Sequence, residues 1–148
     1  MKTKFSRWIF AACVSMTTPW LQSAELITQK EAKLPEANGS LKTRGITRGP
    51  AIKVSSPDLT AAEIKSPFDL KVLFEGRGGN KVDPNAVKIS YLKATEVDLT
   101  PRLQGAISAG GIDFSKAEVP PGEHAIKITV KDLDGRESST VINLIIAK

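Results

Sequence analysis

The stretch that decides the fold runs from residue 121 to residue 147, PGEHAIKITVKDLDGRESSTVINLIIA. Residues 126–130 alternate apolar and polar side chains, as in a strand whose successive side chains point to opposite faces. Asp134-Gly135 supplies the residue types of a tight hairpin turn. The run 140–147 is again apolar at every second position, with further apolar residues between. The stretch therefore predicts a β-hairpin whose second strand is apolar on both faces.

The same period of two recurs upstream, at residues 52–54, 68–74, 87–91 and 112–114. Glycine, proline and asparagine separate these runs, most densely between residues 75 and 85. One helical signal interrupts them, because Thr100 can cap a short helix that begins at Pro101. The pattern predicts an all-β fold, in which residues 51–148 form a single antiparallel β-sandwich of about six to seven strands.

Three segments of this region resemble bacterial immunoglobulin-like modules. They are DPNAVKI at 83–89, EVDLT at 96–100 and PGEHAIKITVKDLDG at 121–135. The last contains a proline-glycine-x-histidine entry to a penultimate strand, followed by an aspartate-x-x-glycine turn. The resemblance implies an immunoglobulin-like sandwich. It implies little about activity, because such modules occur in adhesins, enzymes and envelope proteins alike.

Residues 1–24 have the pattern of a secretory signal peptide. Lys2, Lys4 and Arg7 precede an apolar run that is too short to span a bilayer, and small residues follow at Ser23-Ala24. We expect an exported protein, periplasmic or extracellular, with cleavage near Ala24. The alternative is a lipoprotein anchored through Cys13, since residues 10–13 loosely resemble a lipobox.

Removal of the signal peptide would change the chemistry of the chain. The formal net charge of +5 would fall to +2, which argues against nucleic acid as a partner. The only cysteine would also leave, so the mature domain would depend on a packed core without disulfides. Residues 25–50 are polar and predict a flexible arm or linker. A short helix within 25–34 and docking through Arg44 and Arg48 are the structured alternatives.

Few residues suggest catalysis or metal binding. His124 is the only histidine and has no cysteine beside it in the mature chain, so we expect a structural role at a strand entry, with its ring bonded to nearby backbone. Asp132, Asp134 and Glu137 could supply oxygen ligands to calcium, but the same residue types are typical of a hairpin turn. Residues 76–80 superficially resemble a phosphate loop, yet lead towards a strand. We therefore expect no enzyme, no cofactor and no resident metal.

The sequence favours a non-catalytic exported module that binds a periplasmic or envelope protein, or has a structural role there. Binding would use a sheet face, an edge strand or the arm. Apolar residues at outward positions are the candidate contacts besides the two arginines: Leu73, Leu92, Val141 and Ile145. The alternative is an envelope glycan-binding module, which would need a shallow polar site because the aromatic residues of the mature chain occupy core-facing positions.

Overall fold

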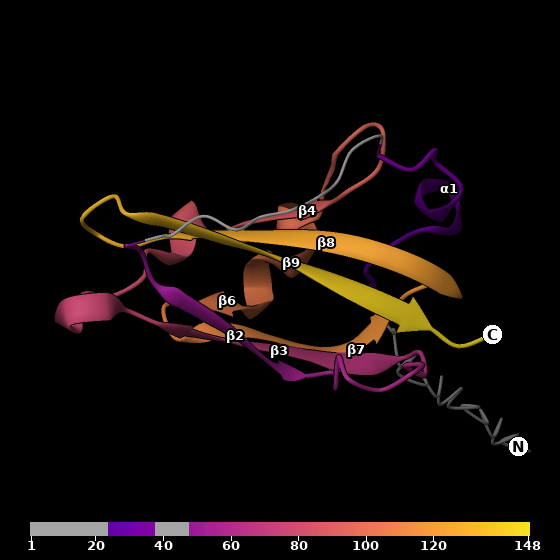
Figure 1. Ribbon diagram of the computed structural model, residues 1–148, viewed down its shortest axis with the longest axis horizontal. Helices are drawn as coiled ribbons and strands as arrows, with labels where there is room; N and C mark the ends of the chain where they lie inside the picture. Colours follow the sequence, from indigo (N-terminus) through magenta and orange to yellow (C-terminus); the bar gives the residue numbers. More distant parts are fainter. Residues whose placement is uncertain (1–23, 38–47) are drawn as a thin grey trace, which may run out of the picture.

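The computed structural model describes residues 24–37 and 48–148 and shows two β-sheets packed face to face (Figure 1). The predicted all-β sandwich is confirmed. The elements in chain order are β1 Ala24–Glu25, α1 Gln29–Ala32, β2 Ala51–Ser56, β3 Phe68–Glu75, η1 Arg77–Gly79, η2 Pro84–Ala86, β4 Lys88–Tyr91, β5 Val97–Asp98, α2 Thr100–Leu103, η3 Gln104–Ala106, β6 Ile107–Ser108, β7 Gly111–Glu118, β8 Gly122–Lys131 and β9 Glu137–Ile146.

The first sheet has the order β1-β7-β3-β2, with β6 paired to β7, and the second has the order β5-β4-β8-β9. All pairings between these strands are antiparallel except that of β1 with β7. The six alternating runs of the sequence form β2, β3, β4, β7, β8 and β9. The three additional strands contain two residues each, which is too short to show a period.

The core lies between the two sheets and is built from alternating residues. In β3, Phe68, Leu70, Val72 and Phe74 are buried, whereas each residue between them is exposed. In β8, residues 126, 128 and 130 are completely buried and face them from the other sheet. This burial of apolar surface from both sheets is the main favourable contribution to stability.

Among the described residues, the segment from Ala24 is already part of the packed structure, although the domain was expected to begin at residue 51. Leu26 and Ile27 are completely buried in the core, and the Leu26 N–H donates to the Glu118 carbonyl at the end of β7 (2.9 Å). The first part of the expected flexible arm is therefore an edge strand and a core segment. Polar composition alone suggested an arm because the two apolar residues are adjacent and show no period.

The expected helix near residues 25–34 is present but shorter, as α1. Its N-cap is Thr28, whose hydroxyl accepts from the Glu31 N–H, while the Glu31 carboxylate accepts from the Thr28 N–H. This reciprocal capping box satisfies two of the otherwise unpaired donors of a helix start. The expected signal peptide (residues 1–23 of it) and Arg44 lie outside the described residues.

The helix predicted after Thr100 is α2, but Thr100 is not its cap. Leu99 occupies the cap position, and the Thr100 hydroxyl instead accepts from the Ile89 N–H (2.9 Å). The Thr100 N–H in turn donates to the Asp98 carboxylate (2.9 Å). The hydroxyl thus ties α2 to strand β4, which no local sequence pattern could indicate.

Candidate functional site

The His124 ring bonds to nearby backbone, as expected from the sequence. Its Nε2 lies 2.7 Å from the Pro120 carbonyl, and its Nδ1 lies 2.9 Å from the hydroxyl of Tyr91. Since a carbonyl can only accept, Nε2 carries the proton and Nδ1 accepts from the tyrosine. Burial lowers the pKa of His124 and raises the pKa of Tyr91 to about 12. Both rings are therefore neutral at physiological pH and are joined by the hydrogen bond between Nδ1 and the tyrosine hydroxyl.

The three calcium candidates take part in the β8–β9 turn. One carboxylate oxygen of Asp132 accepts from the Arg136 N–H (2.8 Å), Asp134 contacts Asn80 and Arg136, and Glu137 pairs with Lys131 (3.2 Å). Gly135 supplies the positive φ of 79° that this turn requires. Within the described part of the chain, no group of three or more acidic, histidine or cysteine side chains could hold a metal ion.

The glycine-rich segment 76–80 forms η1 and continues towards a β-bridge between Val82 and Asp132. It does not open a helix after a strand, which is what a phosphate-binding loop needs. Asn80 instead donates its side-chain amide to Asp134, so this loop and the β8–β9 turn are joined at one end of the sandwich.

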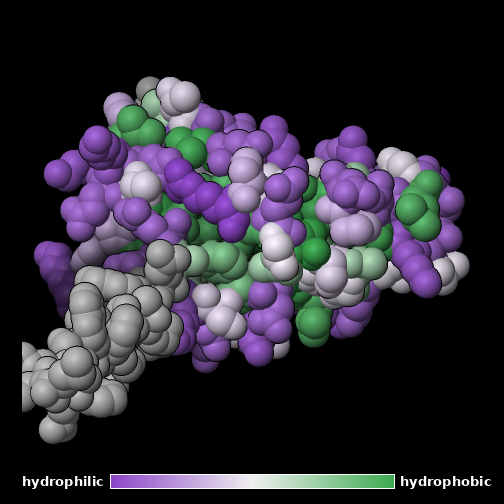
Figure 2. Space-filling view, turned by 180° about the vertical axis from the view of Figure 1, so that it is seen from behind, coloured by the Kyte–Doolittle hydropathy of each residue, from purple (hydrophilic) through white to green (hydrophobic). Residues whose placement is uncertain are grey.

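The outward apolar candidates do not form one surface. Leu73 is half exposed on the outer face of the first sheet, whereas Leu92, Val141 and Ile145 belong to the second. Arg48 is exposed just before β2. Seen from behind, the hydrophobic surface is divided into small areas between hydrophilic residues (Figure 2). This arrangement does not favour binding through one broad apolar sheet face.

In the middle of strand β9, one edge has no backbone partner among the described residues, and it is called the free edge below. The Ile145 carbonyl and the Ala147 N–H bond to Ile64, so the odd-numbered residues of β9 direct their backbone groups away from β8. Ser139, Val141 and Asn143 are also odd-numbered residues of β9, so their backbone groups point away from β8 as well. Their outward N–H and C=O groups have no backbone partner among the described residues.

Both ends of this free edge are covered. Ile64 forms a parallel bridge with Ile146, through bonds of 2.7 and 2.9 Å, at the C-terminal end. Gly49 packs so closely against Glu137 and Ser138 at the other end that a Cβ atom would lie 2.6 Å from the serine hydroxyl. The free edge is therefore confined to a short window, residues 139–143.

Strand β2 lies on the same side of the sandwich, at the edge of the opposite sheet (Figure 1). Its Ile52 and Val54 are only partly buried although they pack against the core. A strand added to β9 would direct alternate side chains towards this seam between β2 and β9. The other side chains would lie beside Val141 on the outer face.

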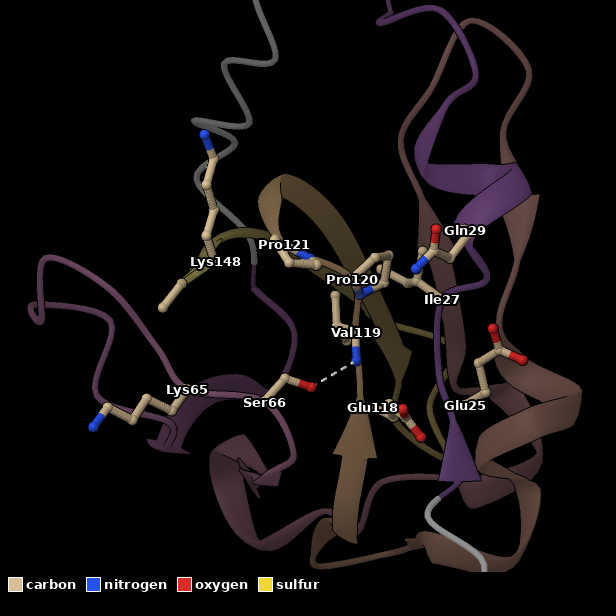
Figure 3. Close-up of a pocket in the computed structure, with 11 residues that line it drawn as sticks. Glu25, Ile27, Gln29, Lys65, Ser66, Glu118, Val119, Pro120, Pro121 and Lys148 are labelled. Carbon is tan, nitrogen blue, oxygen red and sulfur yellow. Dashed lines mark hydrogen bonds between the residues drawn. The ribbon is translucent and has the colours of Figure 1, made fainter.

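A pocket of about 540 Å³ lies near the end of β7 (Figure 3). Lys65 and Lys148 lie on one side of it, and Glu25 and Glu118 on the other. The Ser66 hydroxyl accepts from the Val119 N–H (3.1 Å). The single histidine is bonded to Tyr91 and Pro120, so it is not available to activate this serine.

Comparison of the chain with protein-family models, curated proteins and solved structures finds no match. None of the helices in residues 24–37 and 48–148 combines the length and apolar character needed to cross a bilayer. The site must therefore be interpreted from its own geometry.

Proposed function

We propose that this protein is an exported, non-catalytic interaction module that binds an extended segment of another protein by strand addition to β9. The free backbone edge at residues 139–143 is the observation that carries this proposal. An unpaired strand edge offers a row of donors and acceptors to an incoming strand. Export is inferred from the sequence pattern of residues 1–24.

The strand order supports an immunoglobulin-like topology for this module. The succession β2-β3-β7 opposite β4-β8-β9 corresponds to the A-B-E and C-F-G succession of that fold. In this correspondence β9 is the last strand and lies at a sheet edge. Its position makes the edge accessible without rearrangement of the core.

The pairing of Ile64 supports strand addition at this particular edge. Ile64 already forms a parallel bridge with Ile146 of β9, so the β9 edge can accept an additional strand at Ile146. The chain then leaves the edge, because Ala61 turns back to bond to Asp58. None of the described residues pairs with the edge beside residues 139–143, and we propose that another polypeptide does so.

Photo-crosslinking followed by peptide binding would test the proposal. A photoreactive residue at position 141 of the exported protein should trap a partner segment, whereas one at Leu73 should not. A synthetic peptide of the trapped segment should then bind the protein and protect the amides of Ser139, Val141 and Asn143 from hydrogen exchange. Trapping at position 73 instead, or binding without this protection, would contradict strand addition.

Val141→Pro and Val141→Thr form a matched pair of variants that tests the role of the Val141 N–H. The Val141 N–H points away from β8, so proline removes an outward donor without removing a bond of the β8–β9 ladder. We expect Val141→Pro to fold and lose the peptide, and Val141→Thr to retain it. Equal peptide affinity of the two folded variants would overturn the proposal.

A further inference from the structure

A polar hollow of about 550 Å³ lies on the outer face of the second sheet, separate from the β9 edge window. It crosses β5, β4 and β8 and extends to the start of β9. The residues that line it include Lys88, Ser90, Glu96, Asp98, Lys127 and Thr129. They combine ammonium groups, hydroxyls and carboxylates.

The strand register brings these groups into two adjacent rows. Ser90 lies opposite Lys127 on one side and Asp98 on the other, and Lys88 lies opposite Thr129. Side chains of directly opposed residues on one face have Cβ atoms about 5 Å apart. Lys88 and Lys127 therefore each lie opposite a residue with a hydroxyl group, and Ser90, which is almost completely buried, lies at the base of the hollow.

Some charged side chains of the hollow have a direct partner in the described residues and others do not. Glu137 pairs with Lys131 at 3.2 Å, and Asp98 accepts from the Thr100 N–H at 2.9 Å. For Lys88 and Lys127, by contrast, the described residues supply no carboxylate within ion-pair distance. The pKa of Asp98 is lowered mainly by its hydrogen bonds from Thr100, and Lys88 adds only a longer-range attraction. Lys88 and Lys127 therefore have no direct ion pair among the described residues and can each contact an external anion.

We propose that this hollow binds a carboxylated glycan. A sugar carboxylate would accept from Lys88 and Lys127, and sugar hydroxyls would bond to Thr129 and the Glu96 carboxylate. The mixture of donors and acceptors suits a polyhydroxylated ligand, and the open sheet surface suits an extended chain. Among the described residues no aromatic side chain lines the hollow, which disfavours a ligand whose bases would need to stack.

Titration with a galacturonic acid oligosaccharide would test this inference, with its methyl-esterified form as the uncharged control. We expect the acidic oligosaccharide to shift the amide resonances of Ser90, Lys127 and Thr129, and the esterified one to leave them in place. Lys88→Gln together with Lys127→Gln should weaken binding about tenfold, in line with the loss of two charge-assisted contacts. Lys71→Gln, on the outer face of the other sheet, should leave affinity unchanged.

Equal binding of the esterified oligosaccharide, or unchanged affinity of the double lysine variant, would overturn the inference. Competition by inorganic phosphate at the same concentration would also overturn it, since the hollow would then be a simple anion site. Val141→Pro should bind the acidic oligosaccharide like the wild type. The glycan site and the strand-addition site are therefore tested independently.

Discussion

The ion pair between Glu31 and Arg102 should hold the N-terminal segment on the sandwich, and Glu31→Gln tests this. Arg102 donates to both carboxylate oxygens of Glu31, at 2.7 and 2.9 Å, and also to the Leu26 carbonyl at 2.8 Å. The Arg102 hydrogen bonds, aided by that from the Thr28 N–H, outweigh burial and lower the pKa of Glu31 from 4.5 to about 2. The ionised carboxylate is therefore favoured by the folded state.

The stabilisation by this ion pair can be estimated from the decrease in the pKa of Glu31. A decrease from 4.5 to about 2 corresponds to about 3 kcal/mol of folding free energy at neutral pH. The two side chains are 17% and 32% exposed, so solvent screening lowers the expected effect to about 1–2 kcal/mol. We expect Glu31→Gln to reduce the free energy of unfolding by this amount at neutral pH.

The pH dependence distinguishes this ion pair from a general packing defect. Because the pKa of Glu31 is lower in the folded state, its contribution is complete above 4.5 and is lost as the pH falls towards 2. Urea denaturation should therefore show that the difference in free energy of unfolding between wild type and Glu31→Gln becomes smaller from neutral pH to about pH 3. A constant difference over this range, or none at neutral pH, would refute the reasoning.

An exposed ion pair provides the control. Lys53 and Glu75 are also 2.7 Å apart, but their side chains are 60% and 54% exposed. Glu75→Gln should therefore change stability by less than about 1 kcal/mol. Trypsin cleavage after Lys30, in exposed α1, should become faster in Glu31→Gln and remain unchanged in Glu75→Gln.

Three further predictions concern the core, a buried ring and a close backbone contact. Ile128→Ala should destabilise the protein by about 2–5 kcal/mol in chemical denaturation, and Thr129→Ala by much less, because only Ile128 is completely buried; equal effects would contradict the register. Burial lowers the pKa of His124 below 6.5, so as the pH falls the histidine is protonated in the unfolded chain before it is protonated in the folded protein. The free energy of unfolding of the wild type should therefore decrease between about pH 7 and pH 5. His124→Gln should lack this part of the pH dependence. Gly111→Ala should lower the melting temperature far more than Gly105→Ala, because a Cβ at Gly111 would lie 2.0 Å from a β3 carbonyl at a φ of +150°, whereas Gly105 has open space.

The alternating sheet pattern was predictable from the sequence because it is local. Successive residues of a strand point to opposite faces of the sheet. The buried positions of Phe68, Leu70 and Ile128 could therefore be predicted from the strand's own sequence, without knowing which strand pairs with it. The turn at Asp134-Gly135 was equally local, since its φ requirement and its side-chain bonds lie within a few residues. The backbone bond of His124 also fell within this range, four residues away at Pro120.

The N-terminal part of the fold depended on long-range contacts. Leu26 and Ile27 are buried because β1 pairs with the distant end of β7, and Glu31 is held by Arg102, 71 residues further along the chain. No periodic signal marks a two-residue strand. For the same reason Thr100 was interpreted as a helix cap, whereas its hydroxyl bonds across to β4.

The candidate sites illustrate the same division. The sequence identified Val141 as an outward apolar residue and indicated that glycan binding would need a shallow polar site. It could not show which strands lie at sheet edges, because strand order is set by the packing of the whole chain. Only the tertiary structure shows that the outward backbone groups of Ser139, Val141 and Asn143 have no backbone partner in residues 24–37 and 48–148. It alone places Lys88 beside Thr129 and Lys127 beside Ser90, since these neighbours come from strands about forty residues apart.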